Sequence, residues 1–473
     1  MKTVVVPMDE RPPNYQLVSM IADLNGIEIE LPKKSLLGRY MKPGECEKLI
    51  GWMLSREADR FIISVDMLSY GGLIASREEG ISAETALERL RSVRELRRRF
   101  PNAEIFLSSI VRRASVSVSS AGSKELWTML NKYLWLSGHG KAEEAETVED
   151  ELPRGFISRY RELRLRNHRV NKECLRLVKD GCADLLVLAQ EDTFQHGPQE
   201  RELDILEGIA KDFDIEDRVF IHNGADEVLQ EMLCYRRDRE YPVDVIYDSP
   251  ATRDKVMDFE DREFGKNVES HMKLLGMRQS LDSTTGILIA GTSTTDSIEA
   301  LKNLSKRKQR VFILDVFYPN GSNPSFVEAY LGLGLKNVWG YSAWNTASNS
   351  LGTLLSLALT SGSCEVEKKA LAEFYISRLL DDHLYQGVLR KTLEKIVDES
   401  GGDVYNVSKS KGLFESFRDD VFVPKAEEFL ERFIRGRKLD IYDFSSSKNR
   451  ISIEKFSLPW DRTFECEIEV KIN

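Results

Sequence analysis

The amino-acid sequence of 473 residues predicts an α/β protein whose strands are parallel. Short runs rich in Val, Ile and Leu recur without polar alternation, as expected for strands covered on both faces. Segments with helical periodicity lie between these runs, which predicts right-handed βαβ units. The expected strands are residues 3–8, 27–31, 61–66, 104–109, 185–190, 219–222, 243–247, 286–290, 311–316 and 338–342.

Two architectures can accommodate these ten strands. A (β/α) barrel would use eight and leave two at the periphery, whereas a pair of doubly wound sheets would use all ten. Polar clusters follow almost every run from residue 61 to residue 345. Because an open sheet needs reactive side chains only near the point where its strand order reverses, this pattern favours the barrel. We therefore expect a barrel-like parallel sheet, with doubly wound α/β domains as the alternative.

Helical periodicity is clearest in three segments between the expected strands. Residues 85–100 run into Pro101 and Asn102, which stop a helix, and residues 158–181 end at a glycine. Residues 199–213 form a third amphipathic segment.

The pattern predicts an α/β domain over residues 1–365 and a C-terminal region over residues 366–473. Helical periodicity dominates the start of the second region. Two alternating runs, ISIEKF and TFECEIEVKI, flank LPWDR and predict an antiparallel β pair.

An insertion at about 114–155 interrupts the α/β alternation. Its aromatic part, residues 126–136, predicts a packed helix or a lid over a site. Its acidic part, residues 140–153, predicts a surface loop.

Composition limits the classes of partner and the cellular compartment that we expect for this protein. The formal net charge of −10 argues against nucleic acid as a partner, because phosphate binding needs a basic surface. No apolar stretch reaches the ~18 residues of a membrane span, and the N-terminal run is too short for a signal peptide. Six scattered cysteines without a CxxC pair predict reduced thiols in a cytoplasmic protein. The oligomeric state stays open.

No metal or nucleotide motif is present. The six histidines show neither HxH nor HExxH spacing, so a histidine-based zinc site is not expected. Neither GxGxxG nor GxxxxGK[ST] occurs, so a nucleotide site has no support.

The segment QEDTFQHG places Glu191 and Asp192 directly after an expected strand. Adjacent carboxylates can divide into a general acid and an orienting base, because their repulsion raises one pKa. The alternative is that one of them caps the next helix while the other is solvated. Gln195 and His196 are secondary candidates in the same loop.

The segment NGADEV repeats this pattern with Asp226 and Glu227. These residues are candidate catalytic carboxylates. They equally fit the start of a helix, where an N-cap Asp and a first-turn Glu are favoured.

The segment PMDERPPNY presents Asp9 and Arg11 before two prolines. Arg11 could bind a substrate carboxylate or hold Asp9 in a structural ion pair.

A further cluster follows the strand at 61–66. Asp66, Tyr70 and Arg77 accompany a Gly-Gly pair that allows close backbone approach to a ligand. Arg112 and Arg113 add positive charge at the end of the next strand.

Two later clusters fit the binding of a polar ligand. DVFYPNG offers Asp315 and Asn320, although its Asn-Gly is also a turn signal. SAWNTASNSLG offers Trp344, Asn345 and Asn349. An exposed Trp beside amides suits stacking on a sugar ring, and a buried Trp with a helix cap is the alternative.

These segments together resemble an uncharacterised bacterial family, domain of unknown function 4127. The resemblance rests on PMDERPPNYQ, DMLSYGGLIASR, RNHRVN, AQEDTFQHGPQE, NGADEV, DVFYPNG, YSAWNTASNSLG and LPWDRTFE and covers nearly the whole chain. It implies no established activity. The usual family pattern at 190–192 is Gln-Asp-Asp, so Glu191 departs from it and Asp192 is the firmer candidate.

A second, local resemblance is to glycoside hydrolase family 84. It rests on a carboxylate pair at a strand end and a later Trp-Asn segment. It implies paired acids that work together with the acetamido group of the substrate, and it is a fold-level analogy only.

The leading hypothesis is a hydrolase, a glycosidase acting on a small polar sugar-like substrate. Asp192 would be the acid/base, and Glu191 would orient it or the acetamido group. Asp226 or Glu227 is the alternative choice for the second carboxylate. The remaining candidates would bind substrate: Asp9, Arg11, Asp66, Tyr70, Arg77, Gln195, Asp315, Asn320, Trp344, Asn345 and Asn349.

Two other functions fit the same residues. No cofactor is expected in the leading hypothesis. In the first alternative a divalent metal bound by Asp9, Asp66, Asp192 and Asp315 would catalyse hydrolysis. In the second, the protein binds a small ligand without catalysis and is stabilised by it.

Overall fold

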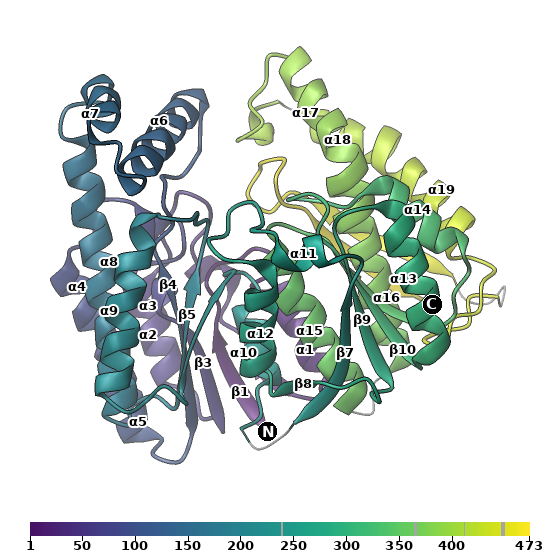
Figure 1. The fold of residues 1–473 in the computed structure, drawn as a ribbon, viewed down its shortest axis with the longest axis horizontal. Coiled ribbons are helices and arrows are strands. Elements are labelled where there is room, and N and C mark those ends of the chain that lie inside the picture. Colours follow the sequence, from purple (N-terminus) through teal and green to yellow (C-terminus); the bar gives the residue numbers. More distant parts are fainter. Residues whose placement is uncertain (238–239, 364–366, 411, 446–449) are drawn as a thin grey trace. The chain divides into compact units, whose positions relative to one another are not determined.

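The computed structural model describes residues 1–237, 240–363, 367–410, 412–445 and 450–473 (Figure 1). The chain divides into two compact units. The first unit contains residues Met1–Val18, Ile27–Leu233 and Phe259–Arg262. The second contains Ser19–Gly26, Cys234–Asp258 and Glu263–Asn473.

The first unit is built on a six-stranded parallel sheet with the order β2-β1-β3-β4-β5-β6. Its strands are β1 (Lys2–Val6), β2 (Glu28–Glu30), β3 (Arg60–Ser64), β4 (Glu104–Val111), β5 (Leu185–Gln190) and β6 (Val219–Asn223). Its helices are α2 (Cys46–Leu54), α3 (Val65–Tyr70), α4 (Ala83–Leu90), α5 (Ser92–Arg99), α6 (Ala121–Gly138), α7 (Ala142–Glu151), α8 (Phe156–Lys179) and α9 (Pro198–Asp212), with short turns η1 (Lys34–Leu36) and η2 (Ala75–Arg77). Two helices, α1 (Gln16–Leu24) and α10 (Val228–Cys234), cross a unit boundary.

The second unit contains a five-stranded parallel sheet with the order β11-β10-β9-β7-β8. Its strands are β7 (Tyr241–Tyr247), β8 (Met277–Gln279), β9 (Thr285–Ala290), β10 (Arg310–Asp315) and β11 (Val338–Ser342). The first group of its helices is α11 (Pro250–Asp254), α12 (Phe264–Leu274), α13 (Thr294–Arg307), α14 (Pro324–Gly332) and α15 (Ala347–Ser363). The later helical segments are α16 (Lys368–Arg378), the π-helical η3 (Leu379–Leu389), α17 (Arg390–Glu399), η4 (Val407–Lys409), α18 (Leu413–Phe417), the π-helical η5 (Arg418–Phe422) and α19 (Val423–Phe433).

The two sheets repeat one topology. In each, the first strand along the chain lies between the second and the third, and the later strands follow in order. The α/β class is therefore confirmed, and strands β1–β11 form two open parallel sheets. The favoured single barrel is wrong, because the strands divide between two separate hydrogen-bonded ladders. In open sheets of this kind ligands bind at the carboxyl ends of strands near the order reversal, here β1/β3 and β7/β9.

Burial explains why the expected strands form. Every residue of β3, β5 and β9 is buried, as the uninterrupted apolar runs predict for strands covered on both faces. In the first unit α3 packs against β3 and β4, and α8 packs against β4 and β5. Serine side chains cap several helices, among them Ser64 at α3 and Ser120 at α6.

The C-terminal pair is confirmed as antiparallel strands β12 (Ile451–Ser457) and β13 (Glu467–Ile472). The predicted boundary at 365/366 lies among residues that the structure does not describe, and both flanking segments belong to the second unit. The acidic part of the insertion forms the helix α7 and not the predicted loop. Ala145 and Val148 lie on one face of this helix and pack into a hydrophobic cluster, which stabilises it. No helix in the described ranges combines the length and the apolar content that a membrane span requires.

Candidate functional site

The carboxyl edge of the first sheet collects the polar loops that follow five of its strands. Because these strands are parallel, their following loops emerge at one edge. The candidate residues of this edge are Asp9 and Arg11 after β1, Asp66, Tyr70 and Arg77 after β3, Arg112 and Arg113 after β4, Glu191 and Asp192 after β5, and Asp226 and Glu227 after β6.

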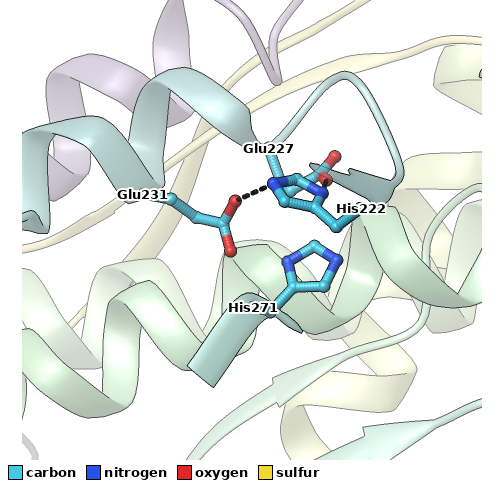
Figure 2. A group of neighbouring side chains, drawn as sticks. All are labelled: His222, Glu227, Glu231 and His271. Atoms are coloured by element: carbon cyan, nitrogen blue, oxygen red, sulfur yellow. Dashed lines mark ion pairs between the residues drawn. The ribbon is translucent and has the colours of Figure 1, made fainter. Parts of the chain in front are cut away.

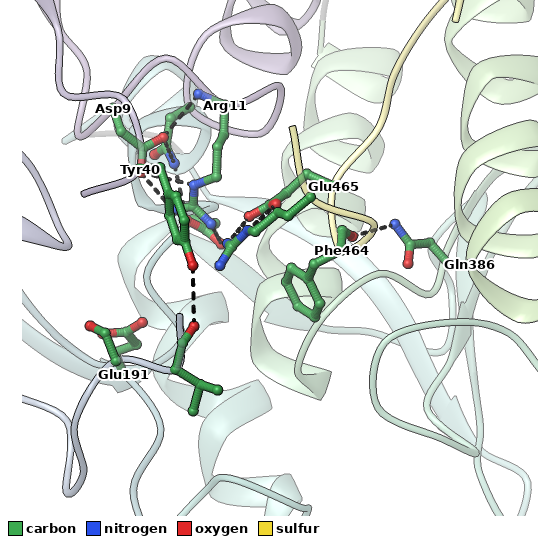
Figure 3. Close-up of polar contacts among 12 residues, drawn as sticks. Asp9, Arg11, Tyr40, Glu191, Gln386, Phe464 and Glu465 are labelled. Atoms are coloured by element: carbon green, nitrogen blue, oxygen red, sulfur yellow. Dashed lines mark hydrogen bonds and ion pairs between the residues drawn. The ribbon is translucent and has the colours of Figure 1, made fainter. Parts of the chain in front are cut away.

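Arg11 contacts Asp9 within the loop after β1 (Figure 3), and it also contacts Asp226 in the loop after β6. Its Nη2 donates to Asp9 Oδ2 at 2.7 Å and to Asp226 Oδ1 at 2.6 Å. Asn14 Nδ2 donates to the same two carboxylates, at 3.2 Å and 3.0 Å. All four side chains are buried. Arg11 therefore forms a structural bridge between two loops of the first unit.

Glu191 and Asp192 form a second charged group with two arginines. Arg77 Nη2 donates to Glu191 Oε1, and Arg113 forms an ion pair with Asp192 Oδ2. Arg113 Nη1 also lies 3.8 Å from Glu191 Oε1. The Glu191 side chain is 14% exposed and that of Asp192 is 23% exposed, whereas the Asp9 and Asp226 carboxylates are almost closed to solvent. Glu191 and Asp192 are thus more accessible than the acids that Arg11 bridges.

The environments of these two acids shift their pKa values in opposite directions. Burial acts to raise the pKa of Glu191, but the charges of Arg77 and Arg113 together outweigh it and hold the pKa below its ordinary value. Burial raises the pKa of Asp192, and the nearby charge of Glu191 adds to this rise against the opposing effect of Arg113. The pair therefore favours an ionised Glu191 beside an Asp192 that retains its proton to higher pH.

The backbone of the loop after β5 is held in an unusual shape. Asp192 has φ of +42°, a left-handed conformation that few non-glycine residues adopt. The amide of Ala114 donates to Asp192 O at 3.1 Å, and the amide of Thr193 donates to Phe259 O at 2.9 Å. Hydrogen bonds with neighbouring segments thus hold the backbone at Asp192 and at the following residue, which fixes the position of the Asp192 side chain.

Buried polar residues behind this edge hold Arg77 in place. Arg112 Nη2 donates to Arg77 O at 3.0 Å, and Arg112 Nη1 donates to Ser76 O at 3.2 Å. Arg166 and Asn167 of α8 also donate to Ser76 O. Arg166 and Asn167 were not among the predicted site residues, although both belong to the segment RNHRVN, whose polar residues inside a long helix were the available signal.

Asp66 and Tyr70 lie in the buried layer rather than in solvent. Asp66 Oδ2 accepts a hydrogen bond from the Ile110 amide at 2.9 Å, and burial raises the pKa of Asp66 to about 7. The guanidinium of Arg166 lies 4.6 Å from the centre of the Tyr70 ring. These contacts give Asp66 and Tyr70 a structural environment. By contrast, Gln195 is exposed in the loop before α9.

Asp226 and Glu227 are adjacent in sequence but enter different groups. Asp226 faces Arg11, and burial raises the pKa of Asp226 despite this charge. Glu227 lies beside His222 and Glu231, and its burial and the charge of Glu231 raise the pKa of Glu227 well above the ordinary value. His222 and Glu231 were not among the predicted site residues. The available signals were a histidine in a buried strand and a Glu one helical turn after Glu227.

The remaining candidates belong to the second unit. Asp315 ends β10, and its Oδ2 accepts hydrogen bonds from Tyr341 Oη at 3.0 Å and from the Asn323 amide at 2.9 Å. Burial raises the pKa of Asp315 to about 7. The Asn320 amide donates to Asn345 O at 2.9 Å, and both residues have left-handed backbone conformations. These contacts brace the two loops against each other.

The Trp344 segment is largely internal. Trp344 is 7% exposed, with its ring centre 6.2 Å from that of Phe464, so it is not the exposed platform that a sugar would stack on. Asn349 is buried and donates to Thr346 Oγ1 at 2.8 Å. The cavity beside Asp315 and Asn345 has about 10 Å³ of room, enough for one water molecule.

The hypothesis of a catalytic divalent metal requires that its acids, Asp9, Asp66, Asp192 and Asp315, lie close together. Asp9 and Asp66 have separate hydrogen-bond partners, and Asp315 belongs to the other unit. Among the described residues, these acids do not form a group with metal-binding spacing.

The comparisons with known proteins decide the family. The family model described as "Protein of unknown function (DUF4127)" matches residues 3–469. The chain belongs to this family. The match extends from β1 to β13, so it includes both units of this DUF4127 protein. No curated protein and no solved structure matches the chain, and the resemblance to glycoside hydrolase family 84 is not shown by these comparisons.

Proposed function

We propose that this protein is a hydrolase acting on a small, polar, sugar-like substrate at the carboxyl edge of the first sheet. The observation that supports the proposal most is the accessible pair Glu191 and Asp192, whose pKa values shift in opposite directions. Glycoside hydrolysis commonly needs one carboxylic acid that donates a proton and one carboxylate that stays ionised.

In the proposed reaction Asp192 donates its proton to the oxygen of the leaving group as the glycosidic bond breaks. Glu191 stays ionised beside Arg77 and orients either Asp192 or an acetamido group of the substrate. The Asp192 carboxylate then takes a proton from the attacking water and returns to its starting state. Arg113 contacts both acids and would hold their carboxylates in place during these steps.

Turnover of a panel of 4-nitrophenyl glycosides, with and without chelator, tests this proposal. We expect release of nitrophenol from at least one sugar, unchanged by the chelator. Glu191→Gln and Asp192→Asn should each lower kcat/KM by at least about 10-fold. Asp204→Asn changes an exposed acid of α9 and should have no effect. Full turnover in both site variants would show that the reaction does not use this pair.

The ion pairs also support a second candidate, a ligand-binding protein without catalysis. Glu191 and Asp192 are already held by Arg77 and Arg113, as in sites that recognise polar ligands by charge. This candidate predicts that a sugar raises the melting temperature while no glycoside in the panel is hydrolysed.

A further inference from the structure

A buried group of ligand-type side chains occupies the junction of β6 and α10. His222 belongs to β6, Glu227 immediately precedes α10, and Glu231 lies one turn further on (Figure 2). One nitrogen or oxygen atom from each residue lies within 4.8 Å of the others. All three residues are at most 1% exposed. The proposed hydrolase reaction does not use this group.

A backbone hydrogen bond orients the imidazole of His222. Its Nδ1 lies 2.8 Å from Asn223 O. Because a carbonyl oxygen can only accept, Nδ1 carries the hydrogen. In the neutral ring the lone pair is then on Nε2, which lies 3.5 Å from Glu231 Oε2. Histidines that bind metals are commonly held this way, with one nitrogen donating to the protein and the other facing the ion.

Glu227 contributes a buried oxygen that accepts no hydrogen bond within the described part of the chain. Its Oε2 accepts from the Ala225 amide at 2.9 Å, which fixes the carboxylate, whereas Oε1 has no such donor. The distance from Oε1 to His222 Nδ1 is 3.8 Å, too long for a hydrogen bond. Burying an unsatisfied carboxylate oxygen is costly, and a cation at this place would remove the cost.

The turn between His222 and Glu227 is shaped around this carboxylate. Gly224 has φ of +105°, a conformation that favours glycine. A Cβ at position 224 would lie only 2.0 Å from Glu227 Oε1. The turn therefore admits glycine alone, and the absence of a side chain leaves room for the carboxylate.

We propose that His222 Nε2, Glu227 Oε1 and Glu231 Oε2 bind one divalent transition-metal ion. One imidazole with two carboxylates suits Zn²⁺ or Mn²⁺ better than Ca²⁺ or Mg²⁺, which prefer all-oxygen sites. The spacing His-x₄-Glu-x₃-Glu matches neither HxH nor HExxH, which is why the sequence predicted no histidine-based site. This site shares no residue with the acids Asp9, Asp66, Asp192 and Asp315, which the sequence suggested as ligands of a catalytic metal.

Metal content and metal binding of the full-length protein test the proposal without any substrate. We expect chelator-treated protein to bind one Zn²⁺ per chain in calorimetric titration, and Mn²⁺ more weakly. Co²⁺ should bind in place of Zn²⁺ and give absorption bands of a nitrogen- and oxygen-ligated ion. Absence of stoichiometric Zn²⁺ binding by the wild-type protein would overturn the proposal.

Variants locate the ion. His222→Asn, Glu227→Gln and Glu231→Gln should each weaken Zn²⁺ binding by more than about 10-fold. His168→Asn is the matched control, because His168 is a buried histidine of α8 in the same unit and should leave binding unchanged. Circular dichroism verifies that each variant is folded. Wild-type affinity in Glu227→Gln and Glu231→Gln, or an equal loss in His168→Asn, would contradict the assignment.

Discussion

The two sheets share one strand order but carry different chemistry at their carboxyl edges. In the first unit the edge is charged, and arginines contact four of the carboxylates that follow its strands. In the second unit the corresponding carboxylates accept hydrogen bonds from neutral donors. Asp248, directly after β7, accepts from the amides of Gly291 and Thr292 at 2.9 Å and from Ser297 Oγ at 2.8 Å.

This difference shows that topology provides a place for a site but not its function. Neutral donors around Asp248 and Asp315 hold the loops of the second unit together and satisfy the carboxylates. The arginines of the first unit instead separate the pKa values of two accessible acids. The same fold element therefore serves as a brace in one unit and as a candidate reaction centre in the other.

The largest expected effect on stability is at Arg11. Arg11→Met leaves the buried carboxylates of Asp9 and Asp226 without their shared cation, which should lower the free energy of unfolding by about 3–5 kcal/mol. Urea unfolding measures the change. Arg169→Met, at an exposed arginine paired with Glu84, is the control and should cost less than about 1 kcal/mol. Equal effects of the two variants would show that the Arg11 bridge does not stabilise the first unit.

A smaller effect is expected at the edge of the second unit. Asp315→Asn replaces an acceptor with an amide that cannot satisfy all the donors around it, which should cost about 1–3 kcal/mol in urea unfolding. Once a substrate is known, this variant should retain kcat. A large loss of kcat at unchanged stability would instead place chemistry at the second edge.

The fold was largely predictable because its strands are buried on both faces. All ten expected strands are present, whereas β8 was missed because two of its three residues are exposed and show no pattern. The strand order could not be predicted, since apolar runs do not encode which neighbours pair. The acidic helix α7 was expected to be a loop because of its acidic composition, and its two buried residues, Ala145 and Val148, gave too weak a pattern to predict a helix.

The candidate site could be predicted in residue type more than in geometry. Adjacent acids after a strand located Glu191 and Asp192, but sequence alone could not show that Glu227 turns toward His222. The burial of Trp344 depends on tertiary packing and was equally beyond a sequence argument.

The pH dependence of kcat/KM would sharpen the contrast between the edges. Activity should fall as pH drops through the depressed pKa of Glu191, because Glu191 then gains a proton, and as pH rises through the raised pKa of Asp192, because the acid is lost. Arg77→Met removes a positive charge and should move the acidic limb to higher pH. Arg169→Met should leave both limbs in place. If Arg77→Met does not shift the acidic limb, that limb does not report the protonation of Glu191.

The smallest expected effect is at Ser117. Ser117 Oγ accepts a hydrogen bond from Arg77 Nη1 at 3.2 Å. Ser117→Ala should therefore lower the free energy of unfolding by only about 0.5–1.5 kcal/mol and reduce kcat/KM a few-fold. Thermal unfolding and steady-state kinetics measure both. A loss of activity as large as that of Asp192→Asn would mean that Ser117 does more than support Arg77.

The most direct test of the proposed chemistry compares leaving groups in the wild-type protein and in Asp192→Asn. If Asp192 donates the proton, its removal should lower kcat/KM by about 10²–10⁴-fold for an alkyl glycoside, whose leaving group needs the proton. The loss should be only about 10-fold for the nitrophenyl glycoside of the same sugar, because its leaving group departs without the proton and only the activation of the attacking water is impaired. Equal losses for both substrates, or no loss for either, would contradict the assignment of Asp192 as the acid.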